Sequence, residues 1–284
     1  MNNNCNQSKS CCFTKIYKKF FSKKNKVAHL LLSGVIGKES KFDSSLNFAN
    51  YQNLIKKAFT TKNIKAVAIS INSPGGSPVQ SELIYNYIRL LAKKHQLPVY
   101  TFAQDVAASG GYWLLLSGDE IYAHQSSIVG SIGVIFSGFG FVDLISKIGI
   151  ERRVHTSGES KAILDPFLPE NPKHQEILKQ AQDDIYQAFV SLVKTKRQNK
   201  LNEQEEKLFS GAFWAGSTAV KLGLVDEIAT LQNKMHEKFG EEVEIIEINE
   251  KKSSFLKNLL TKQSNLASLS NQISEIFAFS RFGL

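Results

Sequence analysis

Short apolar runs alternate with segments of helical periodicity along the first half of the chain. The runs that fit buried strands are residues 27–36, 66–71 and 98–103, and the segments that fit helices are residues 43–60 and 83–91. Asp43 or Ser44 is expected to cap the first helix, and Pro98 ends the second. Strands that alternate with helices at this pace predict an α/β fold of stacked β-α-β units with parallel pairing.

The second half of the chain continues with elements of both kinds. Strands are expected at residues 120–123 and 243–248, and a glycine-punctuated stretch, residues 128–135, follows the first of them. Residues 174–196 repeat apolar positions as a long amphipathic helix does, after a polar loop at residues 156–167. We find no internal repeat and no low-complexity linker. The simplest division is therefore one folded domain, residues 27–250, flanked by an N-terminal segment, residues 1–26, and a C-terminal tail, residues 251–284.

The net charge of +9 is concentrated in the two flanking segments. Residues 1–26 contain seven lysines and no acidic residue, and residues 251–284 contain five basic residues against Glu275 alone. The domain between them is therefore slightly acidic. Because polyanion binding needs a basic surface, nucleic acid is not expected as a partner.

The cysteines and the apolar runs indicate whether to expect disulfides, a metal site or a membrane span. Cys5, Cys11 and Cys12 all lie in the N-terminal segment, so disulfides are not expected to hold the fold, and neither a metal site nor a cofactor is expected. No run approaches the length that spans a bilayer, and no signal peptide is present, which favours the cytoplasm.

Both flanking segments have features of surface attachment. The N-terminal segment interleaves aromatic and basic residues, so it either contacts an anionic membrane peripherally or is a disordered arm. In the tail, Leu266, Leu269, Ile273 and Ile276 recur at helical spacing, which predicts a helix that docks on a partner or on a membrane surface.

Ser109 is the first candidate for chemistry. It follows a predicted buried strand and precedes Gly110 and Gly111, which open an apolar segment that reads as a buried helix. A serine at such a junction lies next to unpaired backbone N–H groups and the positive end of a helix dipole. These groups can stabilise an oxyanion, so we interpret Ser109 as a nucleophile.

A second turn, residues 73–76, offers further backbone donors. The sequence Ser-Pro-Gly-Gly comes at the end of a predicted strand, and its glycines permit close approach of the backbone to a ligand. Gly75 or Gly76 can therefore aim an amide at a carbonyl oxygen. Together with the amide of Gly110 it would form a two-donor oxyanion hole, each donor worth about 3 kcal/mol in the transition state.

A serine nucleophile needs a base, and the residue pattern leaves several candidates. His124 and His155 are not on predicted surface helices, although a structural role is the simpler reading of each. Lys161 lies in a loop and would act as a base only where desolvation lowers its pKa. The residue pattern does not choose among these three.

Five motifs in this chain, taken in order, resemble the signal peptide peptidase A (protease IV) family of serine peptidases. They are Ser-Pro-Gly-Gly (73–76), Asp-Val-Ala-Ala-Ser-Gly-Gly-Tyr-Trp (105–113), Ile-Val-Gly-Ser-Ile-Gly-Val (128–134), Ser-Gly-Glu-Ser-Lys (157–161) and Ala-Val-Lys-Leu-Gly-Leu-Val-Asp (219–226). The resemblance covers roughly residues 27–230. It implies a Clp-protease/crotonase-like fold and a Ser-Lys dyad.

The resemblance also implies a role for each matching residue. Ser109 would be the nucleophile and Lys161 the general base, Gly76 and Gly110 would supply the oxyanion hole, and Ser131 would orient the lysine. The expected activity is hydrolysis of signal peptides or other small or unfolded peptides through an acyl-enzyme. Short members of the family resemble ring-forming oligomers, so a ring-like homo-oligomer is expected, with Lys161 reaching a neighbour's Ser109.

Three other functions remain open at this point. One is a Clp-like peptidase with a Ser-His-Asp triad and His124 as its base. Another is a crotonase-type acyl-CoA enzyme, which would use the same oxyanion geometry without a nucleophilic serine. The third is an inert, membrane-associated scaffold.

Overall fold

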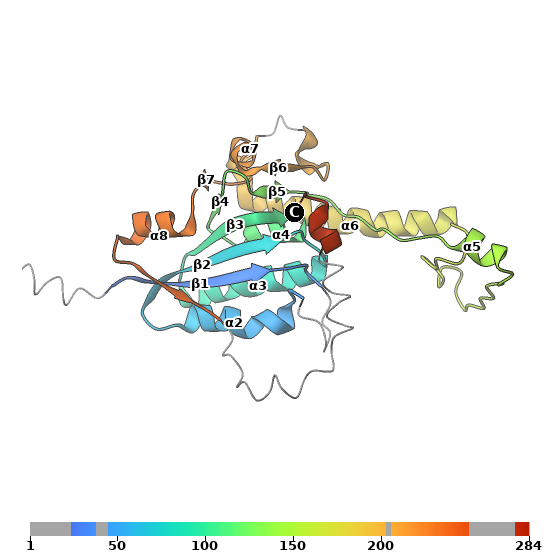
Figure 1. Cartoon of the computed structure of the whole chain (residues 1–284), viewed down its shortest axis with the longest axis horizontal. Coiled ribbons are helices and arrows are strands. Elements are labelled where there is room, and N and C mark those ends of the chain that lie inside the picture. Colours follow the sequence, from blue (N-terminus) through green and yellow to red (C-terminus); the bar gives the residue numbers. More distant parts are fainter. Residues whose placement is uncertain (1–23, 38–44, 203–205, 250–275, 284) are drawn as a thin grey trace, which may run out of the picture.

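One mixed sheet organises the described part of the chain (Figure 1). The computed structural model describes residues 24–37, 45–202, 206–249 and 276–283. The strands are β1 (Lys26–Ser33), β2 (Ile64–Ser73), β3 (Val99–Ala108), β4 (Glu120–Ala123), β5 (Ile128–Gly130), β6 (Phe213–Ala215), β7 (Glu227–Ile228) and β8 (Glu244–Glu247). The three predicted strands of the first half are all present, and β2 and β3 run longer than their apolar runs suggested.

The sheet is parallel except at one edge. Its main order is β6-β5-β3-β2-β1-β8, and β4 pairs with β3 and with β7. The only antiparallel pair among the described strands is β5 with β6. The predicted parallel pairing therefore fails at β6, a three-residue strand that enters the sheet from the opposite direction.

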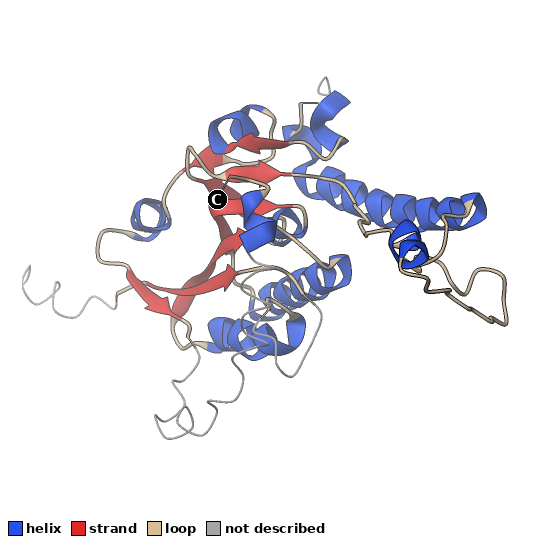
Figure 2. Cartoon of the chain, turned by 45° about the vertical axis from the view of Figure 1, so that its right-hand side comes forward, coloured by secondary structure: helices blue, strands red, loops and turns tan. Residues whose placement is uncertain are grey.

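Helices cover the two faces unequally (Figure 2). The helices are α2 (Phe48–Thr60), α3 (Pro78–His95), α4 (Gly110–Leu115), α5 (Val142–Lys147), α6 (Pro172–Arg197), α7 (Gly216–Lys221) and α8 (Leu231–Phe239), with 3₁₀ turns at Gln198–Lys200 and Glu206–Phe209. The larger core lies between the sheet and α2, α3 and α4, and a smaller apolar cluster lies under α8. The central strands β1, β2 and β3 contribute most of the buried residues of the sheet, whereas β6 and β8 at its two edges have none.

The cap of α2 differs from the prediction. The helix begins at Phe48, and the side chain of Asn47 accepts the N–H of Asn50 at 2.9 Å. Neither Asp43 nor Ser44 is therefore the cap. Asparagine serves the purpose as well as aspartate or serine, because any short side chain with an acceptor oxygen can satisfy an orphan N–H of the first turn.

A long arm projects from the body and touches it only near its root, where Tyr186 packs against the core and donates to the carbonyl of Phe209 at 2.6 Å. We call residues 133–188 the projecting arm; it contains α5, the loop that follows α5, and most of α6 (Figure 1). None of its residues is buried, and α6 becomes buried only from Phe189 onward. The amphipathic pattern of α6 is thus correct, but before Phe189 no apolar side chain of the helix is fully buried among the described residues.

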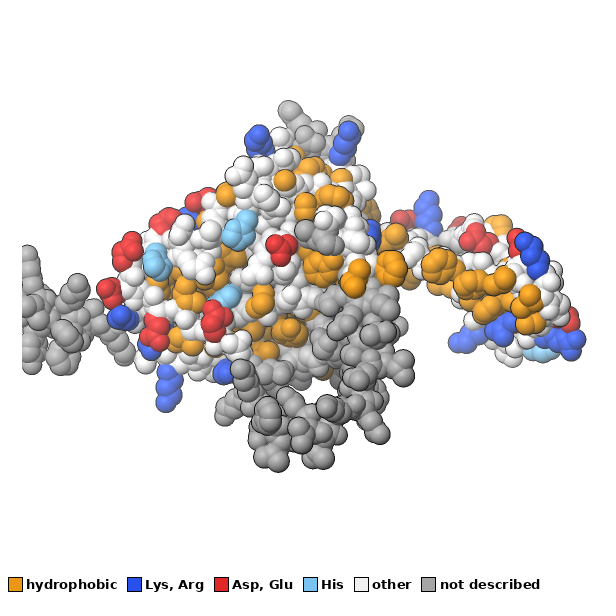
Figure 3. All heavy atoms as spheres, in the orientation of Figure 1, with side chains coloured by type: hydrophobic (Ala, Val, Ile, Leu, Met, Phe, Trp, Pro, Cys, Tyr) orange, Lys and Arg blue, Asp and Glu red, His pale blue; other side chains and the backbone are white. Residues whose placement is uncertain are grey.

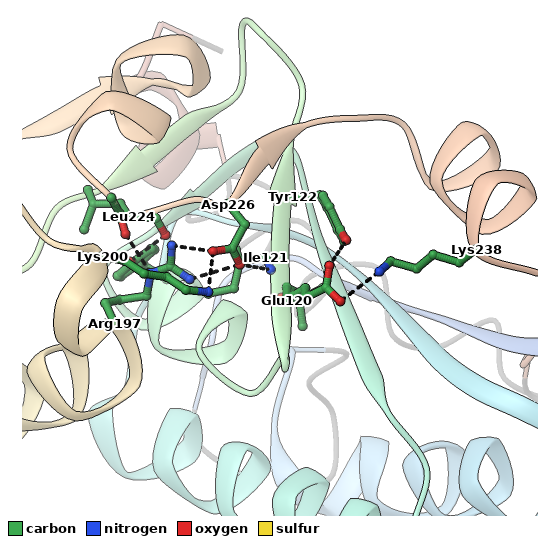
Figure 4. A network of polar contacts seen from close by, with 11 residues as sticks. Glu120, Ile121, Tyr122, Arg197, Lys200, Leu224, Asp226 and Lys238 are labelled. Atoms are coloured by element: carbon green, nitrogen blue, oxygen red, sulfur yellow. Dashed lines mark hydrogen bonds and ion pairs between the residues drawn. The ribbon is translucent and has the colours of Figure 1, made fainter.

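A buried ion pair fastens α6 to the body at the root of the arm (Figure 4). The guanidinium of Arg197 contacts Asp226 at 2.9 Å and donates from Nε to the carbonyl of Gly223 at 2.7 Å. The backbone N–H of Ile121 donates to the same carboxylate at 2.7 Å. Burial opposes ionisation of Asp226, but the donors of Arg197, Lys200 and Ile121 outweigh it and lower the pKa of the carboxyl.

Several expectations concern residues outside the described ranges. They include the membrane contact of the N-terminal segment and the docking helix expected around Leu266, Leu269 and Ile273. Of the helices that are described, none has the length and apolarity needed to cross a membrane.

Candidate active site

Ser109 lies between the end of β3 and the start of α4, as predicted, in a strained backbone conformation. Its φ is +52° and its ψ is −121°, values that a residue with a side chain rarely adopts. The neighbouring strand and helix hold it there: its N–H donates to the carbonyl of Gly130 at 2.8 Å, and its carbonyl accepts the N–H of Trp113 at 3.0 Å. Strain of this kind costs about 1–3 kcal/mol and is concentrated at functional sites.

The Ser-Pro-Gly-Gly turn lies directly beside Ser109. Ile36 holds the turn from the other side, because its N–H donates to Gly75 at 2.8 Å and its carbonyl accepts the N–H of Ser77 at 2.7 Å. Gly75 and Gly76 have φ of +104° and +140°. A Cβ on Gly76 would lie 2.0 Å from the oxygen of Ile36, so only glycine fits.

The backbone N–H groups of Gly76 and Gly110 lie close together beside Ser109. A Cβ on Gly110 would lie 3.4 Å from the nitrogen of Gly76, and a Cβ on Gly75 would lie 2.8 Å from the Cβ of Ser109. Among the described residues, no acceptor is found for the N–H of Gly76 or of Gly110. Both glycines proposed for the oxyanion hole therefore lie next to Ser109, and both have an N–H available for a ligand.

Ser131 lies on the opposite side of the same junction. It follows Gly130, whose carbonyl holds the N–H of Ser109, and its own N–H donates to Ala212 at 2.7 Å. Its φ is +53°, a second strained position beside the nucleophile. The structure thus brings Ser109, Gly76, Gly110 and Ser131 together.

Lys161 is not part of this group. It is exposed in the loop between α5 and α6, and its N–H donates to the carbonyl of Gly158 at 3.2 Å. That loop belongs to the distal part of the projecting arm, away from the sheet (Figure 1). Within the described residues of a single chain, Lys161 therefore does not reach Ser109.

The histidines do not replace the lysine. His124 and His155 are both exposed, and neither forms a hydrogen bond with Ser109. The N–H of His124 donates to Ser127 at 3.0 Å, which holds a turn after β4. In the part of the chain that the structure describes, no three His, Cys, Asp or Glu side chains are grouped so as to hold a metal ion.

Two residues that shape the site were not singled out in the sequence. Ile36 clamps the glycine turn, and the buried Ser81 closes the other side of Gly110: its hydroxyl would lie 2.5 Å from a Cβ on that glycine. The Ser81 hydroxyl donates to the carbonyl of Ser77 at 3.0 Å. Neither residue carries a local signal, because an isoleucine after a strand and a serine in a helix are both common.

Comparison with known families gives two matches. Residues 91–245, more than half of the chain, match the model of peptidase family S49, and residues 36–129 match the model of Clp protease. The two matches together cover the Ser-Pro-Gly-Gly turn, Ser109, Ser131 and Lys161.

Two similar proteins differ in what their names describe. A protein of Brucella abortus named as a Na(+)/H(+) antiporter, NhaA, is 50% identical over 201 residues, which are 71% of this chain and 27% of that protein. A protein of Enterococcus faecium that carries the name signal peptide peptidase SppA is 32% identical over 207 residues, 72% of this chain and 60% of that protein. The chain thus spans about a quarter of the first relative and less than two thirds of the second.

A solved structure supports the fold. A mutant of the 1510-N membrane-bound stomatin-specific protease matches with a TM-score of 0.50 at 17% identity, over 81% of this chain and all of that chain. With the Clp protease match, it confirms the Clp-protease/crotonase-like α/β fold predicted from the sequence.

Proposed function

This chain belongs to peptidase family S49, and from that membership we propose that it is a serine peptidase that forms an acyl-enzyme at Ser109. One observation carries the proposal: a strained serine lies beside two glycine amides that have no acceptor among the described residues. The proposed substrates are signal peptides released in a membrane and other small or unfolded peptides. The name of the Enterococcus faecium relative supports this substrate class.

The geometry suggests how the acyl-enzyme forms. The hydroxyl oxygen of Ser109 attacks the peptide carbonyl while a base takes the hydroxyl proton. The carbonyl oxygen becomes an oxyanion that accepts the N–H groups of Gly76 and Gly110, each worth about 3 kcal/mol. The C–N bond then breaks, the amine leaves with the proton from the base, and water hydrolyses the ester by the same steps.

We assign the base to Lys161 of a neighbouring copy of this chain. The lysine is exposed on the projecting arm, where its own chain offers no cover that would desolvate the ammonium. A closed homo-oligomer would place the arm of one subunit over the site of the next, and Ser131 would then orient the lysine.

The apolar surface of the arm supports an assembly (Figure 3). Large exposed apolar side chains gather there in a way that is unusual for a surface in water. They are Ile135, Phe136, Phe139, Leu144, Ile148, Ile150, Leu164, Phe167 and Ile177. A second copy of the chain would cover them and Lys161 together.

Labelling with a fluorophosphonate tests the proposed nucleophile. Wild-type protein should be labelled at Ser109, and the Ser109→Ala variant should lose both labelling and peptide hydrolysis while keeping its circular dichroism spectrum, because the turn of small residues accepts alanine. Hydrolysis retained by Ser109→Ala would refute the proposal.

The same assay tests the base. Lys161→Ala and Lys161→Arg should both be inactive, since a guanidinium stays protonated and cannot accept the serine proton. His124→Ala is the matched control and should keep the wild-type rate. Loss of activity in a folded His124→Ala protein would instead favour the Clp-like triad.

A further inference from the structure

Strand β3 contains a bulge shortly before the nucleophile. Its pairing with β2 is regular up to Ile71 with Ala103, and the next pair is Ser73 with Ala107. On β2, Asn72 alone therefore faces a stretch of β3 that carries extra residues. This stretch consists of Gln104, Asp105 and Val106. Bulges bend a strand, and they are common beside active sites, where they re-aim the residues that follow.

The bulge determines what lies beside Ser109. With uninterrupted pairing, Ser109 would lie level with Ser77, beyond the Ser-Pro-Gly-Gly turn. The extra residues move it back by about 7 Å, at roughly 3.3 Å per residue, so that it lies level with Gly75. The contacts agree, because a Cβ on Gly75 would lie 2.8 Å from the Cβ of Ser109 and 2.9 Å from the nitrogen of Gly110. The bulge thus brings the nucleophile to the glycine amides.

The side chain of Asn72 bridges the bulge. Its Oδ1 accepts the backbone N–H of Val106 at 3.2 Å, and its Nδ2 donates to the carboxylate of Asp105 at 2.9 Å. The side-chain amide therefore takes the place of a backbone partner for Val106. The backbone carbonyl of Asn72 accepts the N–H of Gly34 at 3.0 Å, which ties the same residue to the chain after β1.

Asp105 orients the amide of Asn72. A carboxylate only accepts hydrogen bonds and a backbone N–H only donates them, so the two partners determine which end of the amide faces each of them. Asp105 is itself exposed to water, which solvates its charge. Asn72 directly precedes the Ser-Pro-Gly-Gly turn, and Asp105 opens the motif that contains Ser109. The pair thus joins the two segments that form the site.

We propose that Asn72 is a positioning residue for the peptidase reaction. Its side chain holds the bulge of β3, and the bulge sets the position of Ser109 relative to the N–H groups of Gly76 and Gly110. Asp105 keeps the amide of Asn72 in the orientation that this requires. The effect on catalysis acts through the backbone. The inference rests on the proposed function, because it takes Ser109 to be the nucleophile.

Loss of the bridge should appear in turnover rather than in substrate affinity. A displaced oxyanion hole weakens contacts made in the transition state, which lowers kcat and leaves KM nearly unchanged. Asn72→Leu keeps the size of the side chain but forms neither hydrogen bond. It should lower kcat and the rate of fluorophosphonate labelling at Ser109 about tenfold or more. Asn72→Asp should lower both as well, because two carboxylates then face each other.

Exchanging the two side chains tests the bridge itself. When Asn72→Asp is combined with Asp105→Asn, the new carboxylate accepts the N–H of Val106 and also a hydrogen bond from the new amide. Both hydrogen bonds are then restored, with donor and acceptor exchanged in the second. The exchange variant should recover kcat to within about threefold of the wild type, a gain that independent sites would not show.

Thr230→Val is the matched control. The hydroxyl of Thr230 accepts the N–H of Asn233 at 3.2 Å, as long as the bond between Val106 and Asn72. It lies at the start of α8, which is well separated from α4 (Figure 1). This variant should have a lower melting temperature than the wild type, because a cap is lost, but it should keep the wild-type kcat.

The outcomes separate this inference from the proposed function. A folded Asn72→Leu protein with the wild-type kcat, or an exchange variant no faster than Asn72→Asp, would overturn the inference alone. Circular dichroism checks the fold, and the exchange decides the matter where Asn72→Leu does not fold. A wild type that is not labelled at Ser109 and hydrolyses no peptide would refute the proposed function, and this inference with it.

Discussion

Gly110 and Ser81 form a tight contact behind the nucleophile. A Cβ on Gly110 would lie 2.5 Å from the hydroxyl of Ser81, a distance that real contacts do not reach. Gly110→Ala should therefore displace the start of α4 and lower kcat/KM about tenfold or more, since catalysis is sensitive to small displacements of the reacting groups.

Removing the hydroxyl should relieve this clash. Gly110→Ala combined with Ser81→Ala should recover part of the lost kcat/KM, whereas Ser81→Ala alone should cost only a hydrogen bond of about 1 kcal/mol in stability. Steady-state kinetics of the four proteins would check this. A double variant as slow as Gly110→Ala would mean that the hydroxyl is not the obstacle.

At the residue scale, the sequence predicts the site residues that belong to short local motifs, because such motifs fix the backbone conformation by themselves. Glycines before a helix and a serine after a strand are local patterns, so they predict Ser109 and Gly110, whereas the choice of Gly76 over Gly75 comes from the family resemblance. In the structure these residues lie together. The roles of Ile36 and Ser81 depend on contacts between distant segments, which no local pattern records. The position of Lys161 relative to Ser109 depends on the arm as a whole.

At the scale of elements, α6 depends on one carboxylate at its base. Asp226→Asn would leave the charge of Arg197 without a carboxylate partner, and the side chain of Arg197 is only 2% exposed. Loss of one partner of a buried pair costs about 3 kcal/mol or more in the free energy of unfolding. Urea denaturation would measure it, with Glu151→Gln as a control, because the pair of Glu151 with Arg153 is exposed.

The same carboxylate makes stability depend on pH. The folded state lowers the pKa of Asp226, so the contribution of this group is complete above the pKa of an unfolded aspartate, about 4. It decreases as the pH falls through the lower pKa of the folded state. The melting temperature should therefore fall on acidification in the wild type, and Asp226→Asn should lose less over the same range.

Elements were predictable where their partners lie close in the sequence. The strands and helices from β1 to β4 follow the apolar pattern, because most of their buried residues belong to one core that the sheet shares with α2, α3 and α4. The direction of β6 was not predictable, since a three-residue strand pairs through contacts far away in sequence. The helical periodicity of apolar residues in α6 predicted the helix correctly. The same periodicity does not show whether the apolar side packs on its own chain or on another one.

For the whole molecule, the separation of Ser109 and Lys161 predicts how much activity two inactive variants recover when they are mixed. Ser109→Ala and Lys161→Ala are each expected to be inactive. When they are mixed in equal amounts, dissociated and reassembled, about a quarter of the sites should combine an intact serine with a neighbour's intact lysine. Peptide hydrolysis should recover to about a quarter of the wild-type rate.

Two results would contradict this arrangement. Verified mixed oligomers without activity would place both groups in one chain, and a fully active wild-type monomer would show that no neighbour is needed. Sedimentation at the assay concentration separates these cases from a simple failure to assemble.

The projecting arm has a consequence for when this protein can act. If the general base comes from a second copy of the chain, as we propose, the peptidase is inactive at low concentration, because a newly made chain has no second copy with which to assemble. Turnover per serine would rise with the amount of protein and vanish on dilution. Such a chain would need no inhibitory propeptide during synthesis, since the unassembled chain would lack its base and could not cleave the surrounding proteins.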